Sequence, residues 1–297
     1  MQADDAAVDQ QALEFVRALA SEVNSGTVQL PSYPEAALRV QRALSSEDVE
    51  LEMVVRAISA EPLLAVRIMQ MANSARINAM GRPIPDLRVA VTRLGYNMVR
   101  IAAMSFVVAQ LQQTPAFAPV QPQLAQLWRQ SVNVAALSRA VARHRTRLNP
   151  DIAVLTGLLH AVGRLCIHVR LAAHPDVLAR PQVCQRILDD WHSDIGGALL
   201  SDWGMADEVI DAVRFHDDAQ RDLSGALDFV DVLATATRLE ALREQLATEL
   251  PTLETVSVLL TRQPALWARL GIDGEGLLAL LAHADEDIRE LQSLLGG

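Results

Sequence analysis

Proline and glycine divide this chain into segments in which apolar residues recur at the three- and four-residue spacing of an amphipathic helix. Residues 6–23 show the pattern first, and that segment ends at the helix-stop sequence Asn24-Ser25-Gly26. Alanine and leucine predominate, few residues are aromatic, and no segment shows the alternation that predicts a strand. The sequence therefore predicts an all-α protein.

The same spacing predicts helices along most of the chain. The segment from Pro62 is apolar on most sides, including Leu63 and Val66, and we expect it to be buried. Asp86 is placed to cap a short helix that ends before a break at Leu94-Gly95. After residues 1–26, helices are predicted over 35–44, 48–59, 62–74, 86–93, 97–113, 124–147, from 150 through 165, 182–203, 206–216 and 223–250, with a helical tail to about 295.

Charge and cysteine content exclude several classes of protein. The formal net charge of −10 makes the chain a poor binder of nucleic-acid backbones and of anionic lipid. No apolar run appears long enough to cross a membrane, and the acidic N-terminus does not resemble a signal peptide, so we expect a cytoplasmic protein. Cys166 and Cys184 are far apart and form no C-x-x-C motif, so neither a zinc site nor a disulfide framework is predicted.

The apolar stretch Thr156–Leu165 carries a single imidazole, His160, between Gly157 and Gly163. Burying that ring costs free energy unless its nitrogens find hydrogen-bond partners or a metal ion. His160 could serve as a metal ligand, as a catalytic group, or as a core histidine held by hydrogen bonds. The residue that follows it is Ala161, whose methyl group can neither bind metal nor move a proton.

Seven short segments, in the right order over about residues 27 to 240, resemble the HDOD domain. This family is a regulatory, degenerate branch of the HD-domain metal-dependent phosphohydrolases. Each motif is weak alone, and the order makes the combination specific. The matching segments are Leu30–Pro34; Glu61–Ala65 with Met71–Ala75; Ile84–Gly95; Leu127–Ser131; Gly157–Gly163; His192 with Gly196, Leu199, Leu200 and Trp203; and Phe215–Asp217.

The resemblance implies where a metal site would lie. In catalytic HD proteins, histidines and an aspartate hold one or two metal ions, which lower the pKa of a bound water for attack on phosphorus. Three histidines are retained here, and the key carboxylate position holds alanine. The implied site positions are Gln130 for the first His, His160, Ala161 for the signature Asp, His192, His216, Asp217 for a second His, and Asp231 as a loose match to a late Asp.

We expect these positions to be the remnant of a metal site, with no catalytic residues, no bound metal and no cofactor. If a metal does bind, His160, His192 and His216 are the expected ligands. We expect the histidines to be buried in or near the old site and hydrogen-bonded to Gln130, Asp217 or the backbone, and the alternative is a weakened metal or phosphate site. The remaining histidines, His144, His168, His174 and His283, are expected to be at the surface or hydrogen-bonded.

A stripe of arginines is a second candidate site. Arg139, Arg143 and Arg147 recur every four residues on the predicted helix over 124–147, so they would share one face. Surface charge runs usually form only a solvated face, and we expect that here. The alternative is a face that binds anions such as nucleotides.

The resemblance implies an N-terminal helical extension (1–26), a two-lobed helical HDOD domain (27–240, with lobes of about 27–114 and 123–240) and a C-terminal helical tail (241–297). We expect a bacterial signal-transduction protein that is not an enzyme, linked to motility, stress response, virulence or second-messenger signalling. Its partners would be signalling proteins, a nucleotide or cyclic-dinucleotide ligand, or a second copy of the chain. The alternative is a metal-dependent nucleotide phosphohydrolase with a reduced HD-type site.

Overall fold

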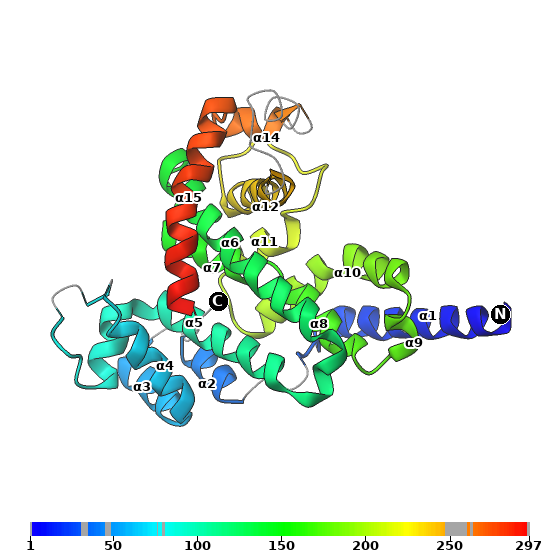
Figure 1. Ribbon diagram of the computed structural model, residues 1–297, viewed down its shortest axis with the longest axis horizontal. Coiled ribbons are helices and arrows are strands. Elements are labelled where there is room, and N and C mark those ends of the chain that lie inside the picture. Colours follow the sequence, from blue (N-terminus) through cyan, green and yellow to red (C-terminus); the bar gives the residue numbers. More distant parts are fainter. Residues whose placement is uncertain are drawn as a thin grey trace. The chain divides into compact units, whose positions relative to one another are not determined.

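The computed structural model describes residues 2–30, 35–44, 49–75, 77–78, 81–246, 260–261 and 264–295. Throughout these residues the regular elements are helices, which confirms the predicted all-α class (Figure 1). Residues 31–34 of the first family motif and the predicted helix residues 247–250 lie outside the described ranges. The helices are α1 (Gln2–Ser25), α2 (Glu35–Leu44), α3 (Leu51–Ser59), α4 (Pro62–Ala72), α5 (Leu87–Gln113), the 3₁₀ helix η1 (Pro115–Val120), α6 (Gln121–Arg145), α7 (Pro150–Leu159), α8 (Val162–Leu171), α9 (Pro175–Leu178), α10 (Pro181–Asp202), α11 (Asp207–Phe215), α12 (Phe229–Leu246), α14 (Pro264–Arg269) and α15 (Gly274–Leu295).

Contacts group the chain into two compact units that alternate along the sequence. Unit 1 contains residues 1–127 and 161–206, and unit 2 contains residues 128–160 and 207–297. The chain therefore passes from unit 2 to unit 1 between His160 and Ala161. The predicted extension, lobes and tail are consecutive segments instead, and their boundaries stay a prediction.

Local sequence signals set several helix ends where they were predicted. The Asp86 side chain accepts a hydrogen bond from the backbone N–H of Val89, at 2.9 Å, and so caps α5. Gly95 has a φ of 76° and interrupts the helical backbone inside α5, as the predicted break at Leu94-Gly95 requires.

Two predicted helices differ from the structure. The stretch 156–165 is not one helix, because α7 ends at Leu159 and α8 begins at Val162, with His160 and Ala161 between them. The predicted helix over 223–250 begins only at Phe229. Its first residues are held outside the helix because Asp228 caps α12, accepting hydrogen bonds from the backbone N–H groups of Val230 and Asp231.

Unit 1 buries its apolar residues between α4 and α5, between α2, α3 and α5, and between α8 and α10. Gly163 allows the close approach of α8 to α10, since a Cβ there would lie 1.9 Å from the carbonyl oxygen of His192. The expectation that α4 is buried on most sides is wrong. Leu63 is 65% exposed and Val66 is 52% exposed, because only one face of α4 packs on α5.

Unit 2 packs α7 against α11 and α12, and buries one face of α15. Gly157 lies against α6, where a Cβ would come within 2.6 Å of the Cα of Ala135. The buried residues of α15 include Leu277, Leu280 and Leu291, which follow the spacing of a single helical stripe. Each fully buried leucine contributes roughly 1.5–3 kcal/mol. This burial holds the C-terminal helix in unit 2.

Among the described residues, two segments are long and apolar enough to cross a membrane, contrary to the expectation that none is. They are Leu87–Gln113, whose most apolar window is 56% buried, and Pro150–Leu171, whose window is 78% buried. The second segment is also interrupted between α7 and α8. Such burial is typical of core helices in a water-soluble protein, and a cytoplasmic location stays an expectation.

Candidate functional site

His160 and His216 come together within unit 2, at the ends of α7 and α11. Their ring centroids lie 6.0 Å apart and the rings are perpendicular. Nδ1 of His160 lies 2.7 Å from the carbonyl oxygen of Gly157, and Nδ1 of His216 lies 2.8 Å from that of Val213. A carbonyl oxygen only accepts, so Nδ1 carries the proton and Nε2 is the acceptor of each neutral ring. His216 is 3% exposed, whereas His160 is half-buried.

These backbone hydrogen bonds have a structural reason. Carbonyl groups in the last turn of a helix have no partner inside the helix, and a side chain that follows can satisfy them. His160 directly follows α7 and His216 directly follows α11, so each ring caps the helix that leads to it. The same arrangement orients the rings of metal-binding histidines in other proteins.

Asp217 lies beside His216, with its Oδ2 atom 3.4 Å from Nε2 of His216. Its side chain is 47% exposed, and it occupies the position where the family pattern has a second histidine. Asp217 also acts on Arg238 of α12. Burial lowers the pKa of the Arg238 guanidinium, and the negative charge of Asp217 opposes that effect.

Two of the implied positions, Ala161 and His192, belong to unit 1. Ala161 is 4% exposed and offers no ligand atom. His192, on α10, is also 4% exposed, and its Nδ1 lies 2.8 Å from the carbonyl oxygen of Leu188 one turn earlier. Its Nε2 lies 3.4 Å from the Arg164 guanidinium and 3.3 Å from the Ser193 hydroxyl. His192 is thus another buried histidine that is tied to backbone and polar neighbours.

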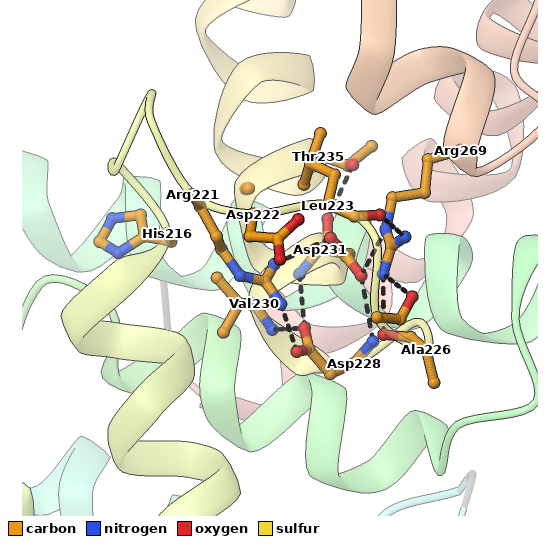
Figure 2. Close-up of polar contacts among 12 residues, drawn as sticks. His216, Arg221, Asp222, Leu223, Ala226, Asp228, Val230, Asp231, Thr235 and Arg269 are labelled. Atoms are coloured by element: carbon orange, nitrogen blue, oxygen red, sulfur yellow. Dashed lines mark hydrogen bonds and ion pairs between the residues drawn. The ribbon is translucent and has the colours of Figure 1, made fainter.

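Asp231 is completely buried and forms the centre of an ion-pair network (Figure 2). Arg221 donates to its Oδ1 atom at 2.8 Å, and Arg269 of α14 donates to Oδ2 at 3.0 Å. Oδ2 also accepts the backbone N–H of Asp228 at 3.1 Å, and Arg221 forms a further ion pair with Asp228. Both carboxylate oxygens are therefore engaged by cations of the chain itself.

The network holds the segment before α12 in place. Asp228 and Asp231 bond to each other's backbone N–H groups, which is the reciprocal arrangement of a capping box. Arg269 adds hydrogen bonds to the carbonyl oxygens of Leu223, Gly225 and Ala226. These contacts fasten α14 of the predicted tail to residues 223–231, and they explain why residues 223–228 are not helical.

Gln130 pairs with a side chain far along the chain. Its Nε2 donates to Glu244 of α12 at 2.9 Å. One turn later on α6, Asn133 donates to Glu240 at 2.7 Å and accepts from Gln292 of α15 at 3.2 Å. Burial raises the pKa of the Glu240 carboxyl, and the hydrogen bond from Asn133 opposes that shift. Gln130 thus belongs to a polar contact among α6, α12 and α15.

The arginine stripe does not form one solvated face. Arg139 is largely buried and forms ion pairs with two carboxylates of α15, Asp287 at 2.6 Å and Glu290 at 2.8 Å. Arg143 is exposed on α6. Arg147 is also exposed, but α6 ends at Arg145, so Arg147 does not continue the helical face. The carboxylates that pair with Arg139 thus belong to the protein itself, and an anion-binding face stays a prediction.

Sequence reasoning missed the two arginines that engage Asp231. Arg221 precedes α12 by a few residues, and Arg269 lies in the tail, nearly forty residues after Asp231. The pair Asp228 and Asp231, spaced as N-cap and N3, could have predicted the cap. No sequence pattern predicts that Arg269 reaches the same carboxylate.

The geometry of these residues limits the chemistry that they can perform. A two-metal hydrolytic centre needs a carboxylate that bridges the ions. Ala161 cannot provide it, and Asp231 has both oxygens paired with arginines. Positions 161 and 231 therefore supply no bridging carboxylate, although the histidines have the proton arrangement of metal ligands and Asp217 lies beside His216.

A family model for the HDOD domain matches residues 30–219, which is more than half of the chain. The chain belongs to the HDOD domain family. The HDOD family is related to HD-type phosphohydrolases, and the resemblance inferred from the seven sequence motifs is confirmed.

Solved structures have the same fold. A Shewanella amazonensis SB2B protein, provisionally named as a metal-dependent phosphohydrolase, is 24% identical with a TM-score of 0.62, covering 94% of this chain and 99% of its own. A Geobacter sulfurreducens HDOD domain protein of unknown function is 23% identical with a TM-score of 0.60, and the match covers 95% of this chain and 99% of the Geobacter chain. A Marinobacter aquaeolei VT8 protein, provisionally named as a signal transduction protein, is 22% identical with a TM-score of 0.61. The match covers 95% of this chain and 66% of the Marinobacter chain.

An uncharacterized protein of Treponema pallidum (strain Nichols) is 29% identical to this HDOD protein over 212 residues. That region is 67% of this chain and 39% of the Treponema protein. The chain thus spans well under half the length of this relative.

Proposed function

We propose that this HDOD protein is a non-catalytic regulator of bacterial signal transduction that acts by binding a partner protein or a small ligand. The pathway would be one of motility, stress response, virulence or second-messenger signalling, and the protein would act in the cytoplasm. Binding modules of this kind need a stable helical surface rather than an activated water molecule.

The proposal rests on the two positions, 161 and 231, where the family resemblance places metal-binding aspartates. Ala161 replaces the signature aspartate with a methyl group, and Asp231 is bonded to Arg221 and Arg269. Withdrawing Asp231 from these arginines would leave Arg269 without its carboxylate partner and Arg221 with Asp228 alone, at a cost of about 3–5 kcal/mol. Asp231 therefore stabilises the fold and is poorly placed to serve as a metal ligand.

A metal-dependent phosphohydrolase is the second candidate, and one observation favours it. His160 and His216 both donate Nδ1–H to a carbonyl oxygen, the arrangement that orients metal-binding histidines. A Shewanella protein of this fold also has a provisional phosphohydrolase name. The missing bridging carboxylate argues against hydrolysis, because the bound water needs a strong and correctly placed positive charge to ionise near neutral pH.

Elemental analysis and phosphatase assays separate the two candidates. The wild-type chain should be purified without chelator and tested for iron, manganese and nickel, and for hydrolysis of p-nitrophenyl phosphate with each metal. We expect no stoichiometric metal and no metal-dependent hydrolysis. Stoichiometric metal, together with hydrolysis that His216→Ala abolishes and Arg129→Gln retains, would refute the proposal.

Affinity purification with mass spectrometry tests the binding role directly. The full chain should capture specific signalling proteins, and His160→Ala should lower thermal stability more than it lowers capture. The reason is that His160 caps α7 through the carbonyl oxygen of Gly157. A variant that melts like the wild type but loses its biological output would contradict this role for His160.

A further inference from the structure

A pocket of about 300 Å³ lies within unit 2 and largely beyond the residues that match the HDOD model. The end of α11, the segment that precedes α12, α12 itself and the start of α14 form its walls. Figure 2 shows part of this wall, including His216, Arg221, Val230 and Asp231. A pocket of this size is at the lower end of the range for small-molecule sites.

Arg238 supplies the pocket with a positive charge that forms no ion pair with a carboxylate of the described residues. Its Nη1 atom donates to the carbonyl oxygens of Ala234, at 2.6 Å, and His216, at 3.2 Å. Its Nε atom is buried and has no hydrogen-bond partner. Within the described ranges, no carboxylate lies at ion-pair distance from this guanidinium, and Asp217 acts on it only from farther away. Burial of a cation without a counterion costs free energy, which a bound anion would offset.

The other arginine of the pocket is already neutralised. Arg221 pairs with Asp228 and Asp231, and Asp231 also pairs with Arg269. These two arginines and two aspartates carry no net charge together. Outside this network, the charged side chains that line the pocket are Arg238 and Asp218, and Arg238 is the cation of the wall that these aspartates do not neutralise.

The rest of the lining is mainly apolar. Phe215 is 41% exposed, an unusual exposure for a phenylalanine, and it lines the pocket together with Val230, Ala234 and Leu266. An aromatic ring and aliphatic side chains beside one guanidinium favour a ligand with an apolar body and one anionic group. Asp218 also lines the pocket and disfavours a ligand with several negative charges.

We propose that this pocket binds a small monocarboxylate with a short apolar body. The planar carboxylate would pair with the Arg238 guanidinium, whose N–H groups match two oxygens in one plane, and the body would contact Phe215 and Leu266. The charge balance disfavours inorganic phosphate and cyclic dinucleotides, which carry more negative charge. This site goes beyond the proposed function, since the ligand would bind whether or not a partner protein docks elsewhere.

Calorimetry and thermal melting of the full chain test the proposal. The probes are acetate, butyrate and benzoate, with benzamide as the neutral match of benzoate and inorganic phosphate as a separate arm. We expect millimolar benzoate or butyrate to raise the melting temperature, by about 2–4 °C at ten times its dissociation constant. We expect benzamide and phosphate to have no such effect.

Two variants and one control locate the binding. Arg238→Gln should weaken carboxylate binding about tenfold or more, because a charge-assisted hydrogen bond is lost. Ala265→Trp adds bulk at an exposed residue of the lining and should weaken binding while Arg238 is retained. Arg129→Gln removes an exposed arginine outside the pocket and should bind like the wild type.

Three outcomes would overturn the proposal. They are the absence of binding by every carboxylate at millimolar concentration, equal binding of benzamide, and carboxylate binding that both Arg238→Gln and Ala265→Trp leave unchanged. If phosphate binds more tightly than benzoate, the ligand class assigned to the pocket is wrong.

Discussion

His168 should make this protein less stable in mild acid. The residue lies on α8 in unit 1, and its Nδ1 atom is buried without a hydrogen-bond partner, which differs from the expected surface or hydrogen-bonded position. Burial lowers the pKa of its imidazole from 6.5 to about 4, and the positive charge of Arg164, one turn earlier, adds to the effect. Protonation therefore disfavours the folded state.

The size and sign of the effect follow from proton linkage. Between pH 6.5 and 4 the unfolded chain binds a proton at His168 more readily than the folded chain does, so stability falls as the pH falls. Above pH 6.5 the ring is neutral in both states and His168 does not lower the stability. The loss of stability that its protonation causes grows as the pH falls and is complete by about pH 4. The shift corresponds to about 3 kcal/mol, and because the imidazole keeps some solvent exposure we expect about 2–3 kcal/mol.

His168→Phe keeps an aromatic ring at this position and removes the titration. Urea unfolding of wild type and variant should be followed between pH 7.5 and 4, and the difference in their unfolding free energies compared at each pH. The variant should gain about 2–3 kcal/mol relative to wild type over this range, because carboxylates that titrate in both proteins cancel in the difference.

His174→Gln is the matched control, since it removes a histidine of the same unit and leaves His168 in place. It should keep the pH dependence that His168 contributes. Nuclear magnetic resonance provides an independent check, through a titration midpoint of the His168 ring near pH 4. Parallel pH profiles for wild type and His168→Phe, or a midpoint near 6.5, would refute the reasoning.

Three substitutions test contacts inside one unit or the other, one in unit 1 and two in unit 2. Gly163→Ala places a methyl group against the backbone of α10 and should destabilise unit 1 by about 3 kcal/mol, measured as a lower urea midpoint. Asp231→Asn removes the carboxylate partner of Arg269 and leaves Arg221 with Asp228 alone, and it should cost about 3–5 kcal/mol, with faster amide hydrogen exchange at the start of α12. Arg139→Gln breaks the ion pairs with α15 and should cost about 1–3 kcal/mol, with increased proteolysis of the C-terminal helix; an unchanged cleavage rate would mean that the other contacts of α15 are enough to hold it.

Features that depend on neighbouring residues could be predicted from the sequence. The all-α class, the cap at Asp86 and the break at Gly95 follow from helical periodicity, a short acceptor side chain and the one residue that readily adopts a positive φ. The HDOD family follows from the order of seven motifs. The substitution of alanine at position 161 is visible in the sequence, and it is the main reason to expect binding rather than hydrolysis.

The tertiary structure decided which polar groups meet. Asp231 could be named as a candidate ligand from the sequence, but only folding brings Arg221 and Arg269 to its two oxygens. Arg139 lay on a predicted arginine stripe, and only the packing of α15 occupies it with carboxylates.

The physical reason is how far apart in the sequence the interacting residues lie. Helix formation depends on backbone geometry and on side chains three or four residues apart, which a sequence displays directly. An ion pair or a pocket depends on elements that are distant in sequence, and the burial that gives Arg238 and His168 their properties exists only after those elements have packed. The sequence by itself thus determined the helices and the lost carboxylate, and tertiary packing determined the roles of the charges that remain.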